Sequence, residues 1–265
     1  MAQPFFSIII ASFNAESLIK ETIDSVLSQD FNDYEIVVKD AVSSDNTLAN
    51  IPQDERIRVY SEKDKGIYDG MNVAISYTNG KYLIFLNCGD YFENNFVLSS
   101  VYKKAVTLNS TFNIIYGDYK KGDIVANQPS KISPFFLYRN TLCHQSVFFG
   151  KELFDALGNY DLNYKICADY DFIVKCYMAK AEFIHLPLVV CYYLPGGFSE
   201  SGQNKKRLVQ EHNSITKKYF SRFAIFKYGF IQFITLKSLR VYLSSEKAPA
   251  FLRKLYRGTI NKITK

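Results

Sequence analysis

The stretch Tyr82–Phe92, YLIFLNCGDYF, decides the fold of this chain. Its first five residues are all apolar or aromatic and leave no polar face, so they predict a strand buried on both sides of a sheet. The run stops at a tight polar turn, Asn87-Cys88-Gly89-Asp90. Ligands of open α/β sheets bind where strands end, so this turn is a candidate site for a metal ion and phosphates. An ordinary turn is the alternative, because Asn, Gly and Asp are common turn formers.

Strands and helices alternate in the residues before this stretch. The hydrophobic spacing predicts strands over 5–11, 34–38, 56–60 and 82–86, with helices over 16–28 and 67–77. This order is typical of a mostly parallel sheet with helices on its faces, in which each strand end contributes one loop to a shared rim. We therefore expect four side chains to lie along one edge of the sheet: Asn14, Asp40, Lys65 and Asp90.

The second half of the chain has a less regular pattern. It predicts helices over 96–108, 151–157 and 168–178, and strands over 112–116 and 143–149. The segment 183–193 is expected to form one or two strands, broken at Pro187. A hairpin or loop is expected over 117–128, with Gly122 at its turn.

The net charge of +6 hides two regions of opposite sign. Residues 205–265 hold 15 Lys and Arg against 2 Asp and Glu, a net of +13, whereas residues 1–204 hold 17 against 24, a net of −7. We therefore expect one α/β domain over 1–204 and a basic, aromatic helical extension over 205–265. A basic segment suits an anionic partner, either nucleic acid or a membrane surface, or is simply a solvated helix face.

Two features favour a cytoplasmic location. The five cysteines are odd in number and no two are spaced as Cys-x-x-Cys, which indicates neither a disulfide framework nor a zinc site and is typical of a reducing compartment. The amino terminus has no basic region, and its apolar run over 5–10 is too short for a signal peptide or a membrane span.

The segment 219–236, YFSRFAIFKYGFIQFITL, is apolar and aromatic but contains Arg222 and Lys227. Each of these cations would cost about 2.5–3.5 kcal/mol at a bilayer centre, so we do not expect the segment to span a membrane. Aromatic residues mixed with Lys and Arg suit a helix that lies in the interface of an anionic membrane. The alternative is a pair of helices packed on the first domain or on a second subunit of a homo-oligomer.

Six separated motifs between residues 5 and 215 resemble the family 2 glycosyltransferases of the GT-A fold. They are SIIIASFN (7–14), KDAVSSDNT (39–47), SEKDKGIYDGMNVAI (61–75), YLIFLNCGDYF (82–92), CHQSVFF (143–149) and KICADYDF (165–172). Chance agreement of six motifs in the expected order is far less common than agreement of one. The turn Asn-x-Gly-Asp, in place of the familiar Asp-x-Asp, is similar to a branch used in bacterial surface polysaccharide assembly.

The resemblance implies an inverting transfer of a sugar from a nucleotide-diphosphate donor, expected to be a UDP-sugar, to a lipid-linked or saccharide acceptor. Such a reaction would take place in the cytoplasm, including the inner face of the cytoplasmic membrane. Two rivals stand beside it: a catalytically silent module of the same fold that binds nucleotide or glycan, and a nucleic-acid binder that rests only on the basic segment. We expect no nucleic-acid partner.

The expected donor-binding residues are Ser12, Asn14, Asp40, Lys65, Gly66, Asn72, Asn87 and Arg207, and the resemblance itself assigns the roles of the loop after the first strand and of Asp40. Asp40 would accept a hydrogen bond from uracil or ribose. Lys65 and Gly66 open a helix, and a helix amino terminus beside a cation attracts phosphate. The ordinary alternatives are a solvated strand-end carboxylate for Asp40, a surface amide for Asn72 and a solvated cation for Arg207.

The chemistry is expected at four further residues. Asp169 matches the family's catalytic base, while Asp171, about 200° around the same helix, is expected to be structural. Asp90 is the expected ligand of Mg²⁺ or Mn²⁺, in a weak site completed by the substrate, because it is the only acid of its turn. His144 and Gln145 are placed near the donor sugar or the acceptor, although a lone His more often makes a local hydrogen bond.

Overall fold

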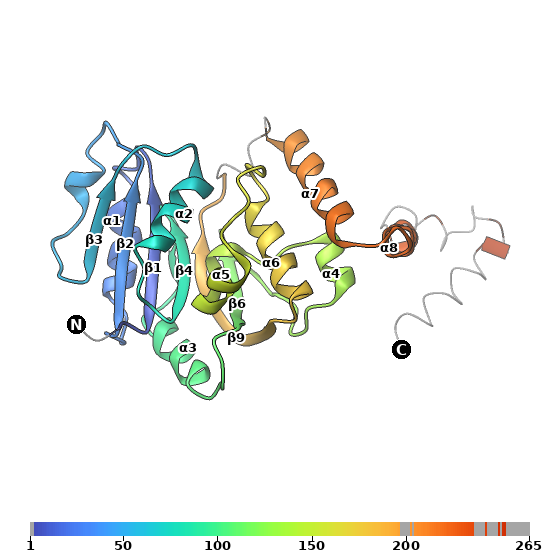
Figure 1. Ribbon diagram of the computed structural model, residues 1–265, viewed down its shortest axis with the longest axis horizontal. Helices are drawn as coiled ribbons and strands as arrows, with labels where there is room; N and C mark the ends of the chain where they lie inside the picture. Colours follow the sequence, from blue (N-terminus) through green and yellow to red (C-terminus); the bar gives the residue numbers. More distant parts are fainter. Residues whose placement is uncertain are drawn as a thin grey trace. The chain divides into compact units, whose positions relative to one another are not determined.

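The computed structural model describes residues 3–196, 202, 204–235, 242, 249 and 251–252 (Figure 1). Two compact units divide the chain, Met1–Ile215 and Thr216–Lys265. The boundary expected between residues 204 and 205 stays a prediction.

The first unit begins with alternating strands and helices. Its elements are β1 (Phe6–Ser12), α1 (Ile19–Leu27), β2 (Tyr34–Asp40), the 3-10 helix η1 (Leu48–Asn50), β3 (Ile57–Ser61), α2 (Ile67–Ser76) and β4 (Tyr82–Asn87). They are followed by β5 (Tyr91–Phe92), α3 (Val97–Ala105), β6 (Asn113–Lys121), β7 (Ile124–Ala126), α4 (Pro134–Arg139), η2 (His144–Ser146), β8 (Val147–Gly150), α5 (Lys151–Leu157), α6 (Ala168–Met178) and β9 (Glu182–Tyr193). The helix α7 (Lys205–Tyr219) continues into the second unit, which contains α8 (Arg222–Thr235).

The first four strands form the parallel half of one sheet, in the spatial order β3-β2-β1-β4. The register pairs Ser12 with Asp40, Asp40 with Ser61, and Ala11 with Asn87. The carboxyl ends of the four strands therefore meet at one edge, as the sequence predicts. The helix α2 lies against β1 and β2, and α1 lies beside β5.

The other half of the sheet is mixed, in the order β4-β8-β6-β9-β5, with β7 paired to β6. The strand β8 runs antiparallel to both β4 and β6, whereas β6 and β9 are parallel. The predicted hairpin at Gly122 is confirmed, with φ 56° at that glycine. The segment 183–193 is one continuous strand that passes Pro187, and register shifts opposite it, around Asp118, accommodate the irregularity.

One predicted strand is partly wrong. The segment 143–149 begins as the 3-10 turn η2, in which the Ser146 amide donates to the Cys143 carbonyl at 3.0 Å, and only then becomes β8. The turn places His144 and Gln145 beside the end of β4 instead of within a ladder. Apolar periodicity did not reveal this turn because the residues around it are buried.

The core of the first unit consists of both strands and helices. Ile8, Ile10, Val38, Ile84 and Leu86 have no solvent exposure, which explains the unbroken apolar runs of the parallel strands.

Among the described residues, no helix is both long enough and apolar enough to cross a membrane.

Candidate active site

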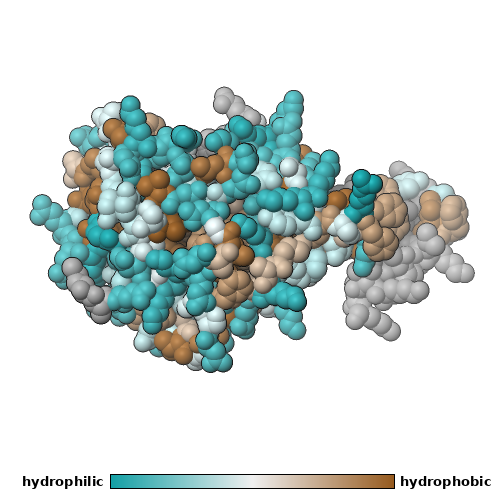
Figure 2. All heavy atoms as spheres, in the orientation of Figure 1, coloured by the Kyte–Doolittle hydropathy of each residue, from teal (hydrophilic) through white to brown (hydrophobic). Residues whose placement is uncertain are grey.

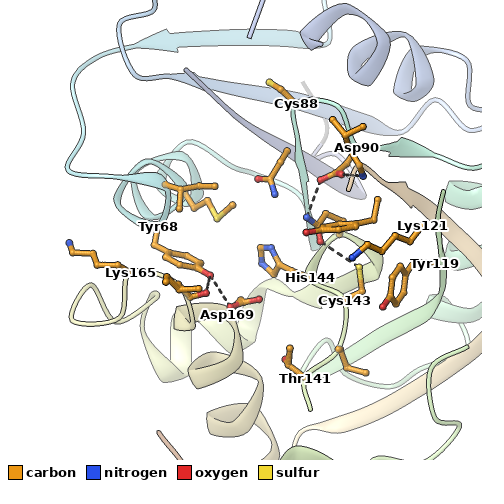
Figure 3. A pocket seen from close by; sticks show the side chains of 18 residues that line it. Tyr68, Cys88, Asp90, Tyr119, Lys121, Thr141, Cys143, His144, Lys165 and Asp169 are labelled. Carbon is orange, nitrogen blue, oxygen red and sulfur yellow. Dashed lines mark hydrogen bonds between the residues drawn. The ribbon is translucent and has the colours of Figure 1, made fainter. Parts of the chain in front are cut away.

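One pocket lies at the end of β4, between α2, the turn η2 and the start of α6 (Figure 3). Its volume is about 420 Å³. Five of the twelve predicted site residues line it: Asn87, Asp90, His144, Gln145 and Asp169. They come from sequence positions up to 82 residues apart, so the fold brings the predicted metal ligand and the predicted base to one cavity.

The turn after β4 requires a glycine. Gly89 has φ 96°, and a Cβ at this position would lie 2.5 Å from Leu194 Cδ2. The Asp90 amide closes the turn by donating to the Asn87 carbonyl at 3.0 Å, and the Gly89 amide donates to Thr22 Oγ1 at 2.9 Å. The backbone thus aims Asp90 into the pocket and away from the sheet.

Asp90 is a buried acid with few hydrogen-bond donors. Its Oδ1 accepts from the Leu194 amide at 2.8 Å and its Oδ2 from Gln145 Nε2 at 2.9 Å. Burial raises the pKa of Asp90 to about 6, and the hydrogen bonds from Leu194, Gln145 and Asn87 offset only part of that effect. A bound cation would stabilise the ionised form of such a carboxylate.

The residues around Asp90 fit one divalent cation. Asn87 Oδ1 is buried and has no hydrogen-bond partner, and an amide oxygen is a suitable ligand for Mg²⁺ or Mn²⁺. Within the described part of the chain, no group of three or more His, Cys, Asp or Glu could hold a metal ion alone. A site here would need oxygens from a ligand in addition to Asp90 and Asn87.

Asp169 lies in the first turn of α6 and reaches the pocket. The Tyr68 hydroxyl, from α2, lies 2.8 Å from Asp169 Oδ1 and 2.8 Å from the Ile166 carbonyl, so its single proton is shared between two acceptors (Figure 3). Burial, and then the neighbouring Asp169, raise the pKa of Tyr68. Asp171 is buried and does not line the pocket.

The segment before α6 is held by one carboxylate. Glu211, from α7, accepts hydrogen bonds from three consecutive backbone amides, those of Lys165 at 2.9 Å, Ile166 at 2.9 Å and Cys167 at 3.0 Å. Its side chain is buried, and such charge-assisted bonds are stronger than neutral ones. Glu211 therefore fixes the backbone that leads into the turn carrying Asp169.

His144 is enclosed by aromatic rings. Its ring stacks on Phe85 with centroids 4.9 Å apart, and its Nε2 lies 2.8 Å from the Tyr160 hydroxyl. Burial lowers the pKa of His144, so the ring is neutral at pH 7. The neighbouring Gln145 donates to Asp90, so the two residues of the predicted His-Gln pair have different hydrogen-bond partners.

Asp40 lies at the edge of the parallel strands but outside the pocket. The hydroxyls of Ser12, at 3.2 Å, of Ser61, at 2.8 Å, and of Ser43 donate to its carboxylate, as does the Ser43 amide at 2.9 Å. Burial alone would raise the pKa of Asp40, but these bonds together lower it. In this structure Asp40 is buried and organises the loop after β2; its predicted contact with the donor stays a prediction.

The loops after β1 and β2 are joined by reciprocal hydrogen bonds. Asn14 has φ 47°, its amide donates to Ser43 Oγ at 2.9 Å, and its Oδ1 accepts from the Ser44 amide at 2.9 Å. The Ala15 amide donates to Thr47 Oγ1 at 2.7 Å. Two strand-end loops therefore form one unit, with Asn14 exposed on it.

The remaining predicted residues have diverse surroundings. Lys65 is exposed, and Gly66, with φ 131°, precedes the first turn of α2. Asn72 exchanges two hydrogen bonds with the Tyr160 backbone, at 2.9 and 3.0 Å, so it holds the loop before α6. Arg207 Nε donates to Glu211 at 3.0 Å. None of these four lines the pocket, and their donor roles stay predictions.

Three residues of the site were not predicted from the sequence. Tyr68 is one of many tyrosines in the chain and carries no signal of its own. Glu211 has one signal, because it is one of only two acids within the strongly basic segment 205–265. Lys121 extends from the β6–β7 hairpin into the pocket, with its Nζ 5.2 Å from the centre of the Tyr193 ring (Figure 3). Nothing in the local sequence distinguishes Lys121 from a surface lysine.

The parallel half-sheet with its joined strand-end loops, and the pocket beside it that holds Asp90 and Asp169, agree with the GT-A fold that the sequence motifs imply. Comparison with known proteins agrees with this class. The chain belongs to glycosyl transferase family 2, whose model matches residues 7–158. The family and fold implied by the sequence motifs are thereby confirmed.

Relatives and solved structures extend the match beyond that region. A PGL/p-HBAD biosynthesis glycosyltransferase of Mycobacterium bovis is 31% identical over 221 residues, which cover 78% of this chain and 84% of the relative. S. aureus TarS 1–349 in complex with UDP-GlcNAc superposes with a TM-score of 0.67 at 17% identity, over 91% of this chain and 75% of that one. The Pyrobaculum calidifontis mannosyltransferase PcManGT, solved with GDP-Man and Mn²⁺, gives 0.67 at 16% identity, over 100% and 82%.

Proposed function

We propose that this glycosyltransferase inverts the anomeric centre of a nucleotide-sugar donor, with Asp169 as the general base. The observation that carries the proposal is that Asp169 and Asp90 line the same pocket from two different elements. In the proposed reaction Asp169 receives the proton, and Asp90 lies in the turn expected to meet the diphosphate. An inverting transfer needs both functions on opposite sides of the reacting carbon.

The reaction forms one bond and breaks one. The acceptor hydroxyl oxygen bonds to the anomeric carbon, the bond from that carbon to the diphosphate oxygen breaks, and the nucleoside diphosphate leaves with the electron pair. The hydroxyl proton passes to an Asp169 carboxylate oxygen. Tyr68 donates to Oδ1, so it holds the carboxylate in one orientation while the proton is transferred.

The donor is proposed to be a UDP-sugar. The joined loops after β1 and β2 offer backbone groups and the Asp40 network to a base and ribose, and Gly66 with Lys65 offers a helix amino terminus and a cation to phosphate. Asn72 and Arg207 are predicted to contact the donor directly. In this structure Asn72 donates to the Tyr160 carbonyl and Arg207 donates to Glu211, so we propose that they support the site. The TarS complex with UDP-GlcNAc supports the choice of nucleotide.

We propose that a bound Mg²⁺ or Mn²⁺ ion is held by Asp90 and Asn87 Oδ1 together with donor oxygens. When bound, such an ion would neutralise charge on the departing diphosphate. Asp90→Asn should remove the Mn²⁺-dependent part of the stabilisation that a nucleoside diphosphate gives the protein. Asp123→Asn, in an exposed turn, is the matched control, and retention of the Mn²⁺ effect in Asp90→Asn would exclude this site.

The acceptor is proposed to be lipid-linked or an oligosaccharide of a surface polysaccharide, as the Asn-x-Gly-Asp branch suggests. The His144–Gln145 turn lines the pocket and is the proposed contact for the transferred sugar or the acceptor. A lipid-linked acceptor would be presented at the inner face of the cytoplasmic membrane.

A panel of UDP- and GDP-sugars tests the proposal against a catalytically silent binding module. A ligand at 100 times its Kd should stabilise the protein by about 2.7 kcal/mol, which thermal unfolding detects. We expect one UDP-sugar to stabilise the chain and to be consumed, with release of UDP. Stabilisation without any release of UDP, even with saccharide acceptors, would favour the silent module.

A further inference from the structure

The helix α8 exposes four phenylalanine side chains on a single face. The exposed fractions are 75% for Phe223, 74% for Phe226, 55% for Phe230 and 58% for Phe233. At about 100° per residue these four positions fall within an arc of about 80°. Figure 2 shows apolar side chains over this helix. Scattered exposed apolar residues are normal on a protein surface, but four aromatic rings along one stripe mark an interaction surface.

Two cations border this phenylalanine stripe. Arg222 lies about 20° beyond Phe233 on one side, and Lys227 about 40° beyond Phe223 on the other. Both are exposed. Long cationic side chains beside an apolar stripe keep their charged ends in water or among headgroups while the rings are buried.

We propose that α8 lies in the interface of an anionic membrane, with the phenylalanine stripe among the acyl chains and Arg222 and Lys227 at the phosphates. The inference deepens the proposed function, on which it rests for a membrane-presented acceptor. The helix contains Arg222 and Lys227, and each of these cations would cost about 2.5–3.5 kcal/mol at a bilayer centre. It suits a position along the surface and not across it.

The helix is formed before it meets a partner. The hydroxyl of Ser221 accepts a hydrogen bond from the Ala224 amide at 3.2 Å, which caps the first turn. Tyr228 packs edge-on against Phe220, with centroids 6.2 Å apart. The stripe is therefore preorganised, and binding does not have to fold the segment.

Charge decides between a membrane and a second copy of the chain as the occupant. Residues 216–235 contain four Lys and Arg and no Asp or Glu, a net charge of +4, so two copies joined through this face would bring two basic segments together. Anionic lipid headgroups instead attract every one of these cations that comes within a Debye length, about 8 Å at physiological salt. The same residues that oppose a dimer favour an anionic bilayer.

Sedimentation of the full chain with lipid vesicles tests the proposal without donor or acceptor, so its failure is separate from failure of the transfer reaction. We expect binding to phosphatidylcholine vesicles that contain phosphatidylglycerol, and at least tenfold weaker binding to phosphatidylcholine alone. Phe226→Ser with Phe230→Ser should weaken binding at least tenfold. Arg222→Gln with Lys227→Gln should weaken binding to the anionic vesicles by about fivefold per cation.

The control removes apolar surface of similar exposure elsewhere. Phe96 and Val106 lie in the first unit and are 52% and 53% exposed, so Phe96→Ser with Val106→Ser should leave vesicle binding unchanged. Equal loss in this control and in the α8 variant would overturn the proposal. The proposal would also be overturned if wild type does not bind the anionic vesicles and forms a dimer in sedimentation equilibrium that Phe226→Ser with Phe230→Ser converts to monomer.

Discussion

The Tyr68 hydroxyl and Asp169 Oδ1 lie 2.8 Å apart, although the two residues are 101 positions apart in the chain. They come from α2 and α6, the two helices whose first turns border the pocket. The hydrogen bond therefore links the helix proposed to receive the donor phosphates to the helix that carries the proposed base. A change at either residue should affect the other's part in the reaction.

Tyr68→Phe should lower kcat by about 10- to 100-fold and leave donor affinity nearly unchanged. A hydrogen bond to a charged group contributes about 1.5–3 kcal/mol, and here it orients the proposed base. Steady-state kinetics with the preferred donor measure the effect. Tyr77→Phe is the matched control, because its hydroxyl donates to Glu62 at 3.1 Å outside the pocket. Equal kcat in wild type and Tyr68→Phe would contradict the orienting role.

Glu211→Gln should lower both the free energy of unfolding and kcat. The variant retains a side chain of the same shape but loses the charge that three amides before α6 donate to, at a cost of about 1.5–3 kcal/mol. Urea unfolding and turnover at saturating donor measure the two effects. Glu182→Gln, an exposed residue of β9, should change neither. A stable Glu211→Gln protein with wild-type kcat would show that the backbone before α6 does not need this carboxylate.

His144 should make the protein less stable as the pH falls below about 6.5. Burial lowers the pKa of His144 in the folded state, whereas an unfolded chain has a His pKa of about 6.5. Below that value the unfolded chain takes up the proton first, so the free energy of unfolding decreases by up to about 1.4 kcal/mol per pH unit. Denaturant unfolding of wild type and His144→Gln between pH 7 and 5 isolates this contribution.

As the pH falls from 7 to 5, the free energy of unfolding of wild type should decrease relative to that of His144→Gln. The comparison is needed because Asp90, whose pKa is raised to about 6, acts in the opposite direction and stabilises the fold as it becomes protonated. Parallel curves for the two proteins would mean that His144 becomes protonated in the folded state as easily as in the unfolded one.

The parallel half of the fold could be predicted from local sequence because each strand there is an unbroken apolar run followed by a polar turn. Tyr82–Asn87 is the clearest case, and Gly89 adds the turn that the positive φ requires. The sequence predicts a strand at the turn η2 because all three residues of this turn are buried, as they would be in a core strand. Hydrophobic periodicity separates helix from strand, but not short turns within a core.

The candidate site was predictable where motifs supply the acids, and not where distant side chains support them. Asp90 follows from the turn after its strand and Asp169 from the family resemblance. Their partners Tyr68 and Glu211 depend on the packing of α2 and α7 against the start of α6. Asn72 is the opposite case, a residue predicted to bind the donor that instead has a supporting role in the structure. Its amide resembles a ligand group in the sequence, and the fold uses it to hold the Tyr160 backbone.

The transfer rate of Asp169→Asn, measured together with its donor affinity, tests the central claim most directly. Asparagine keeps the shape of the side chain and cannot accept the acceptor's proton, so transfer should fall by about 10²–10⁴-fold while donor binding stays within a few-fold of wild type. Asp155→Asn, at an exposed position of α5, should retain full activity. Wild-type transfer by Asp169→Asn would contradict the assignment of Asp169 as the base.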